Sequence, residues 1–110
     1  MNTEDVIARR VLDKDGQHYE VLIYRPTEDE ISDYSCRWSL VDEAGMIEAT
    51  GKMHGIDEVQ VLLFTLMILG DQLAAMPGDY SHLGTPDGGF PRMVHPGNDN
   101  EILWRLPLGT

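Results

Sequence analysis

Four polar side chains in the C-terminal third are of types that bind metal ions. His82, Asp87, His95 and Asp99 offer two imidazoles and two carboxylates within one segment. Their spacing matches no tight ligand motif, and the segment around them is rich in Gly and Pro. The polarity of a solvated loop explains these residues better than a metal site does. We therefore expect no metal and no other cofactor.

Candidate nucleophiles and bases are equally isolated. Cys36 falls on the expected core face of a strand, where a thiol is inert unless a base or a helix terminus lowers its pKa. Neither Ser35 nor Ser81 lies in a Gly-x-Ser-x-Gly motif. His54 precedes a helix cap and is expected to be structural, and residues 84–89 lack the Lys-Ser/Thr ending of a phosphate loop. The sequence predicts no catalytic residue, so an enzyme is the less favoured interpretation.

The charge of the chain restricts its partners. Nineteen Asp and Glu against eight Lys and Arg give a formal net charge of −11, which disfavours binding to a nucleic-acid backbone. Several arginines nevertheless lie in the first third, on predicted strands. Cross-strand pairing with Glu20 or Glu48 is the simplest expectation for them, and a local basic patch is the alternative.

Length and composition predict one soluble domain. With 110 residues and 42% apolar content, the chain is expected to form a single domain over residues 1–92, followed by a tail, 93–110, that packs on the domain or on a partner. A lone cysteine cannot form an internal disulfide. The longest apolar run, residues 61–69, is too short to cross a membrane. We expect a cytoplasmic protein that does not associate with membranes.

Two successive β-hairpins are predicted in the first half, because apolar residues alternate along four segments joined in pairs by Asp- and Gly-containing turns. The strands are expected at residues 6–12, 18–25, 35–41 and 46–53, with turns at 13–16 and 42–45. Residues 27–33 are acidic and read as a solvated loop. Together these segments predict a four-stranded antiparallel meander. Residues 101–108 are either a fifth, edge strand or an extended cover, and Trp104 among them needs a burial site.

One long helix is predicted over residues 57–75. Asp57 is a suitable N-cap, and Gln60 three residues later completes the spacing of a capping box. Pro77 and Gly78 end the helix. At about 27 Å, from 1.5 Å per residue, such a helix can cross a four-stranded sheet.

This helix is apolar on more than one side. A broad stripe is expected to face the sheet; it consists of Val59, Leu62, Leu63, Leu66, Leu69, Gly70, Leu73 and Ala74. A thinner outer stripe is formed by Val61, Phe64, Ile68 and Ala75, and no Lys or Glu lies between residues 59 and 75. Monomers seldom expose a contiguous apolar patch. The outer stripe is therefore expected to be covered by the C-terminal tail, by a second copy of the chain or by another protein.

Several short motifs surround the helix. They are Ala8-Arg9-Arg10, Arg25-Pro26, Gly55-Ile56-Asp57-Glu58-Val59-Gln60, Leu83-Gly84 and Gly89-Phe90-Pro91. With these motifs the chain resembles, over residues 6–92, a family of small uncharacterised bacterial single-domain proteins, a domain of unknown function. The resemblance implies no particular activity.

The sequence thus predicts an α+β two-layer sandwich, a meander sheet with one helix across one face. Three functional hypotheses remain. The first is a protein-contact module, most simply a homodimer joined through Val61, Phe64, Ile68 and Ala75, with Trp104 as a further contact. The second is an immunity or antitoxin protein whose acidity complements a basic toxin. The third is a small-ligand or metal-binding protein with its pocket between the sheet and the tail, near His82, Arg92 and His95.

Overall fold

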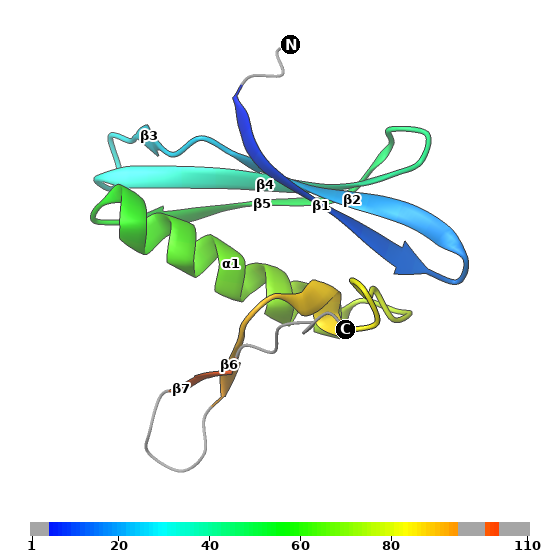
Figure 1. Cartoon of the computed structure of the whole chain (residues 1–110). Helices are drawn as coiled ribbons and strands as arrows, with labels where there is room; N and C mark the ends of the chain where they lie inside the picture. The colour runs from blue at the N-terminus through cyan, green and yellow to red at the C-terminus, as the bar shows by residue number, and fades with distance from the viewer. Residues whose placement is uncertain (1–4, 95–100, 104–110) are drawn as a thin grey trace.

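An antiparallel sheet covered on one face by a single long helix forms the body of the molecule (Figure 1). The structure is a computed structural model that describes residues 5–94 and 101–103. In chain order the elements are β1 (Val6–Lys14), β2 (Gln17–Tyr24), β3 (Thr27–Glu28), β4 (Tyr34–Asp42), β5 (Ile47–Gly55), α1 (Glu58–Ala75), the 3₁₀ turn η1 (Asp87–Gly89), β6 (Arg92–Val94) and β7 (Glu101–Leu103). This arrangement confirms the predicted α+β class.

The sheet runs in the order β1-β2-β4-β5, and all of its pairings are antiparallel. A fifth strand, β3, pairs with β4 just beyond the end of β2. Pro26 separates β2 from β3 because a residue without an N–H cannot continue the ladder. The extra strand therefore comes from the acidic loop. The C-terminal residues of β7 do not extend this sheet, but pair with β6 in a separate two-stranded ribbon.

The core lies between the sheet and α1. Its apolar strand residues alternate as period two requires, and the buried ones are Leu12, Val21, Ile23, Cys36, Trp38 and Leu40. Gly51 is opposite Trp38 in the β4–β5 register, and a Cβ there would lie 2.6 Å from the indole nitrogen. Only glycine leaves room for this indole between β4 and β5.

The ends of α1 agree with the prediction. A side-chain oxygen of Asp57 accepts a hydrogen bond from the backbone N–H of Gln60 at 2.7 Å. The Gln60 side chain in turn accepts one from the backbone N–H of Ile56 at 2.9 Å, so two helix-start donors are satisfied reciprocally. The helix ends at Ala75, just before Met76 and Pro77.

The faces of α1 differ from the prediction. Val61, Thr65 and Leu69 are 0% exposed and, with Leu73 at 3%, face the sheet at four-residue intervals. Val61 was expected on the outer stripe, and that assignment is wrong. Val59 and Leu63, expected in the core, are 74% and 39% exposed. A helix with apolar residues on every side has no polar face to fix its rotation.

Thr65 shows why the apolar pattern of the helix did not reveal its sheet-facing side. Its hydroxyl donates to the carbonyl of Val61 at 2.7 Å, within the helix itself. A hydroxyl satisfied in this way can be fully buried. Thr65 is therefore a core residue, although its side chain is polar.

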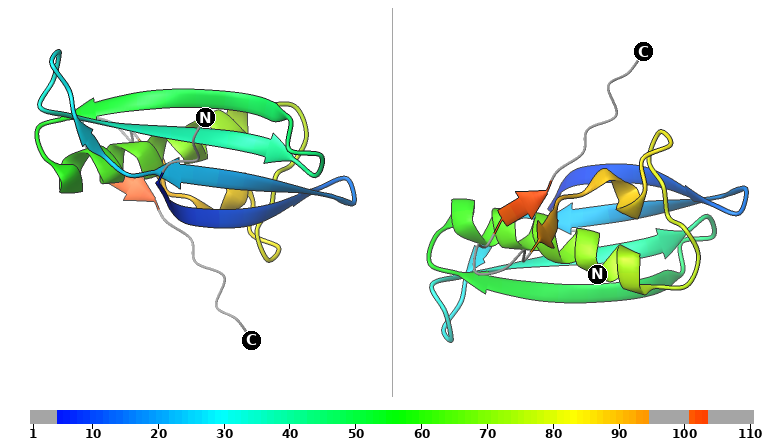
Figure 2. Two further views of the ribbon diagram at one scale, coloured as in Figure 1. Left: turned by 90° about the horizontal axis from the view of Figure 1, so that it is seen from above. Right: turned by 90° about the horizontal axis from the view of Figure 1, so that it is seen from below.

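The C-terminal covering segment, residues 80–91, closes the β1 side of the molecule. Asp13 and Ser81 exchange two backbone hydrogen bonds of 2.8 and 2.9 Å, which extends the β1 edge locally. Phe90, 5% exposed, lies beneath the guanidinium of Arg10 at 4.9 Å. Figure 2, from below, shows this segment beside α1 on the side of β1. The part of the chain after the helix thus covers one flank of α1.

The strand β6 continues from this segment and contacts α1. Met67 is only 8% exposed, although it is two residues from Thr65 and so turned by about 200° away from the sheet-facing side. The helix is therefore buried on more than one side, as its sequence required. By length and apolar content α1 is also the one helix among the described residues that could span a membrane, a test that core helices of soluble proteins pass as well.

Candidate functional site

Of the four candidate metal ligands, the structure describes His82 and Asp87. Nδ1 of His82 lies 3.0 Å from the carbonyl of Val11, so this imidazole is tied to the β1 edge. Asp87 opens the turn η1. His95 and Asp99 lie outside the described residues. Within the described part of the chain, no three His, Cys, Asp or Glu side chains lie close enough together to hold a metal ion.

Cys36 occupies the core position that alternation predicted. It is 1% exposed, and its thiol donates to the carbonyl of Tyr24 at 3.3 Å. Burial raises the pKa of the Cys36 thiol, which disfavours the thiolate. The geometry gives this cysteine a packing role.

The space between the sheet and the covering segment is small. A cavity of about 100 Å³ is bounded by β1, β2, α1 and Phe90, and its lining is mainly apolar. Leu66 is the helix residue in this lining. His82, one of the residues near which the ligand pocket was predicted, does not line this cavity. The side chains of Arg92 and His95 lie outside the part of the chain that the structure describes.

The position of Leu66 shows which way the outer-stripe residues of α1 face. Phe64 and Ile68 are each two residues from Leu66 and thus turned by about 200° from it. Because Leu66 points toward β1 and β2, these two side chains occupy the opposite flank of α1, on the side of β5. Both are partly buried and Ala75 is exposed. Phe64, Ile68 and Ala75 define the β5 flank, while Trp104 lies outside the described residues.

The outer edge of β5 adjoins this flank. All nine residues of β5 belong to one strand that pairs with β4 on its inner side. None of the residues described by the structure pairs with its outer side. An open strand edge offers a row of backbone donors and acceptors to another chain. The β5 edge and the β5 flank together form one candidate interaction surface.

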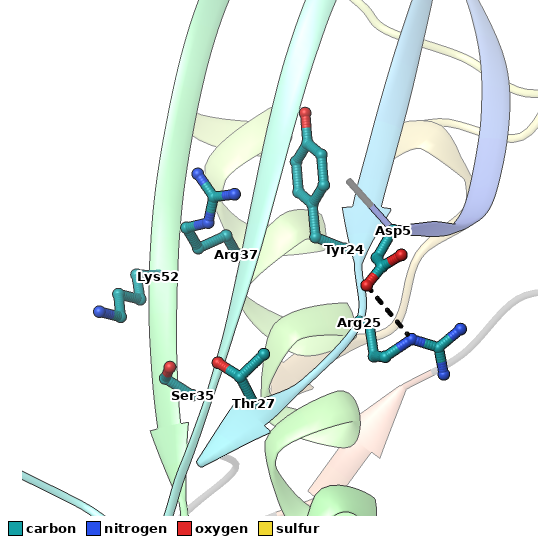
Figure 3. A pocket seen from close by; sticks show the side chains of 7 residues that line it. All are labelled: Asp5, Tyr24, Arg25, Thr27, Ser35, Arg37 and Lys52. Carbon is teal, nitrogen blue, oxygen red and sulfur yellow. Dashed lines mark ion pairs between the residues drawn. The ribbon is translucent and has the colours of Figure 1, made fainter. Parts of the chain in front are cut away.

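A second candidate lies on the open face of the sheet, away from α1. Figure 3 shows a pocket there, formed by neighbouring strands and the residues that follow β2. Its volume is about 280 Å³. It is lined by Asp5, Tyr24, Arg25, Thr27, Ser35, Arg37 and Lys52. The lining has three cations and one carboxylate, and that carboxylate, on Asp5, lies 3.6 Å from Nε of Arg25. Arg37 and Lys52 make the rest of the pocket locally basic in an acidic protein.

A chain of hydroxyl groups positions the aromatic ring of this pocket. The Tyr24 hydroxyl lies 3.5 Å from Oγ of Ser39, which lies 3.4 Å from Oγ1 of Thr50. Thr50 donates in turn to the carbonyl of Trp38 at 2.8 Å. The chain crosses from β2 through β4 to β5. It holds the Tyr24 ring, and the guanidinium of Arg37 lies over that ring at 4.8 Å.

A polar cluster borders the pocket at the β3 end. Oδ2 of Asp29 lies 3.5 Å from Nζ of Lys52 and 3.7 Å from Nδ1 of His54. Oγ of Ser32 is 2.9 Å from the same Nδ1 and donates to the carbonyl of Tyr34. In a catalytic triad the serine and the carboxylate bind opposite imidazole nitrogens. Here both approach Nδ1, so the cluster orders the loop rather than activating a nucleophile.

Sequence reasoning did not find the pocket, although one signal was present. Tyr24, Arg37 and Lys52 each occupy a strand position that alternates with core residues, and so point to the open face. Only the register between β2, β4 and β5 places them side by side. The alternative of a local basic patch corresponds to this site.

One comparison with known proteins identifies the family. Residues 8–90 match the model of a family described as a domain of unknown function, DUF6968. No curated protein and no solved structure matches the chain. The family match spans most of the chain, from β1 to the end of the covering segment. The chain therefore belongs to DUF6968, a family of domains of unknown function.

Proposed function

We propose that this protein acts by protein contact, as a homodimer formed by the β5 edge and the β5 flank. One observation carries the proposal: an open strand edge of nine residues lies beside a helix flank with two large apolar side chains, Phe64 and Ile68. Pairing across a two-fold axis would satisfy the edge and cover the flank together.

The sequence of β5 is compatible with pairing to itself. In an antiparallel register centred on Gly51, Glu48 of one copy faces His54 of the other, and Thr50 faces Lys52. Thr50, Lys52 and His54 share the open face of the sheet by alternation, and Glu48 lies next to them at the register irregularity between Ile47 and Ala49. A carboxylate opposite an imidazole and a hydroxyl opposite an ammonium are favourable cross-strand neighbours. The register therefore places no like charges directly opposite each other.

The helices would meet on the other face of the joined sheet. Because α1 contacts β4 and β5, the same two-fold axis brings the two β5 flanks toward each other. Phe64 and Ile68 of one copy would then pack against those of the second copy. The C-terminal covering segment lies on the opposite flank and leaves this approach open. Val61, buried against the sheet, takes no part in the proposed contact.

Sedimentation velocity of the full chain over a range of micromolar concentrations tests this proposal. The wild-type protein should sediment as a dimer. Phe64→Glu should weaken self-association by at least about 10-fold, because dimerisation would bury an unpaired carboxylate.

Val59→Glu is the matched control, since Val59 is 74% exposed on the same helix and away from the β5 flank. This variant should remain dimeric. A wild-type chain that stays monomeric throughout the concentration range would refute the proposal, and so would equal dissociation of the two variants.

A further inference from the structure

The pocket on the open face has the composition of an anion site. We propose that it binds a small phosphorylated molecule, with the phosphate held by Arg37 and Lys52. These two cations come from β4 and β5, where they are cross-strand partners, and they line one pocket in a chain with a formal charge of −11. Arg25, the third cation of the lining, lies 3.6 Å from the carboxylate of Asp5. This clustering, rather than the total charge, determines which ligand the pocket attracts.

Arg37 is prepared for such a ligand. Its guanidinium stacks over the Tyr24 ring at 4.8 Å, and the hydroxyl of that ring lies 3.5 Å from Oγ of Ser39. An arginine oriented in advance loses less conformational freedom on binding. Its planar fork matches two phosphate oxygens.

Lys52 and Thr27 add to this recognition from two sides of the pocket. The Lys52 ammonium lies 3.5 Å from Asp29, a side chain that is only 12% exposed. Asp29 thereby restrains the lysine beside the pocket without being part of its lining. Thr27 is exposed and contributes a hydroxyl donor. Figure 3 shows Thr27 and Ser35 near one end, with Tyr24, Arg37 and Lys52 above them.

The size of the pocket limits the ligand. A volume of about 280 Å³ is just below the usual range of roughly 300 to 1,000 Å³ for small-molecule sites, so the ligand must be small. It can admit a phosphate with a ring attached, and the Tyr24 side chain offers an apolar surface to such a ring. A long nucleic acid would meet the acidic remainder of the protein, so a small phosphate ester is the better match.

Calorimetric titration of the full chain at low salt, with adenosine 5′-monophosphate as the probe, tests the inference. Adenosine serves as the uncharged control and inorganic phosphate as the ring-free one. We expect saturable binding of the monophosphate and none of adenosine. Inorganic phosphate that binds as well as the monophosphate would support the charged part of the site as the determinant. Failure of both phosphates to bind, or equal binding of adenosine, would overturn the proposal.

Variants locate the binding. Arg37→Ala should weaken the affinity by about 10-fold through loss of the bidentate contact. Lys52→Gln should weaken it by about 3-fold and leaves Tyr24 and Arg37 in place if Arg37→Ala unfolds. Arg9→Ala removes the same charge from another strand of the open face and should change the affinity by less than about 2-fold. An Arg9→Ala loss as large as that of Arg37→Ala would reduce the effect to general charge and refute the site.

The Phe64→Glu variant separates this inference from the proposed dimer. Phe64 lies on the helix side of the sheet, whereas the pocket lies on the open face. Phosphate binding should therefore persist in a monomeric Phe64→Glu protein. Loss of phosphate binding in that variant, while it remains folded, would contradict a pocket contained within one copy.

Discussion

The two edges of the main sheet are treated differently by the same chain. At β1, the covering segment adds the Asp13–Ser81 backbone pair, and the Arg10 side chain donates to the carbonyls of Gly88 and Gly89. At β5, none of the described residues adds a comparable contact. The described residues therefore close the β1 edge and leave the β5 edge unpaired.

The family match sharpens this difference. It begins on β1 and ends at Phe90, the residue packed beneath Arg10. The covering segment is thus part of the domain shared by the family. An open β5 edge beside a closed β1 edge is accordingly expected to be a feature of the fold and not of this chain alone.

The largest effect should come from removing the packing at the closed edge. Phe90 is 5% exposed and, together with β1, β2 and Leu66, borders the cavity of about 100 Å³. Phe90→Ala should lower the free energy of unfolding by about 3 kcal/mol or more, through lost burial and an enlarged cavity. Urea denaturation measures the change.

Leu83→Ala is the control within the same segment, because Leu83 is 73% exposed. Its effect should stay within about 0.5 kcal/mol. If the two variants were equally stable, the covering segment would not be part of the core.

A smaller loss is expected from the polar contacts of the same edge. Arg10 donates hydrogen bonds of 3.2 and 3.3 Å to two carbonyls and lies over Phe90. Arg10→Ala should therefore lower the free energy of unfolding by about 1 to 2 kcal/mol. The neighbouring Arg9 makes an exposed pair of 3.7 Å with Glu20, and Arg9→Ala should cost no more than about 0.5 kcal/mol. Urea titration of both variants compares the Arg10 contacts to the covering segment with an exposed ion pair. A larger loss of unfolding free energy for Arg9→Ala would show that the Arg10 contacts do not stabilise the β1 edge.

The contrast between the edges also explains what the sequence could and could not predict. Local signals were sufficient for the hairpins and the helix ends: Asp15 and Gly16 turn with positive φ angles of 54° and 78°, and Asp57 caps α1 as its spacing indicated. The Asp13–Ser81 pairing joins backbone groups that are distant in the sequence, and no side-chain pattern predicts it.

The candidate sites could not be predicted fully from the sequence, because they too depend on how distant elements pack together. The rotation of α1 was ambiguous because leucines lie on every side, so Val61 was placed outward and Val59 inward. The basic pocket depends on the register of three strands, and the hydrophobic pattern of each strand alone does not provide it. The β5 flank was found in part, since Phe64 and Ile68 were already separated from the core stripe.

The smallest effect on stability is expected on the β5 side of the sheet, and it should depend on pH, unlike the packing on the β1 side. The backbone N–H of Ile31, 2.8 Å from the carboxylate, and the Lys52 ammonium hold the pKa of Asp29 below its ordinary value of 3.8, although burial acts in the opposite direction. A lowered pKa in the folded state means that the unfolded chain binds more protons, so this stabilisation is complete above pH 3.8 and is lost as the pH falls below it. Asp29→Asn should therefore be less stable than the wild type at neutral pH, and the difference should shrink on acidification.

Urea titrations at neutral and acidic pH measure this difference in stability, with Glu30→Gln as the exposed control in the same loop. The loss caused by Phe90→Ala, which is one of packing, should stay the same at both pH values. A pH-independent loss for Asp29→Asn would mean that the β5 side, like the β1 side, depends on packing and not on charge.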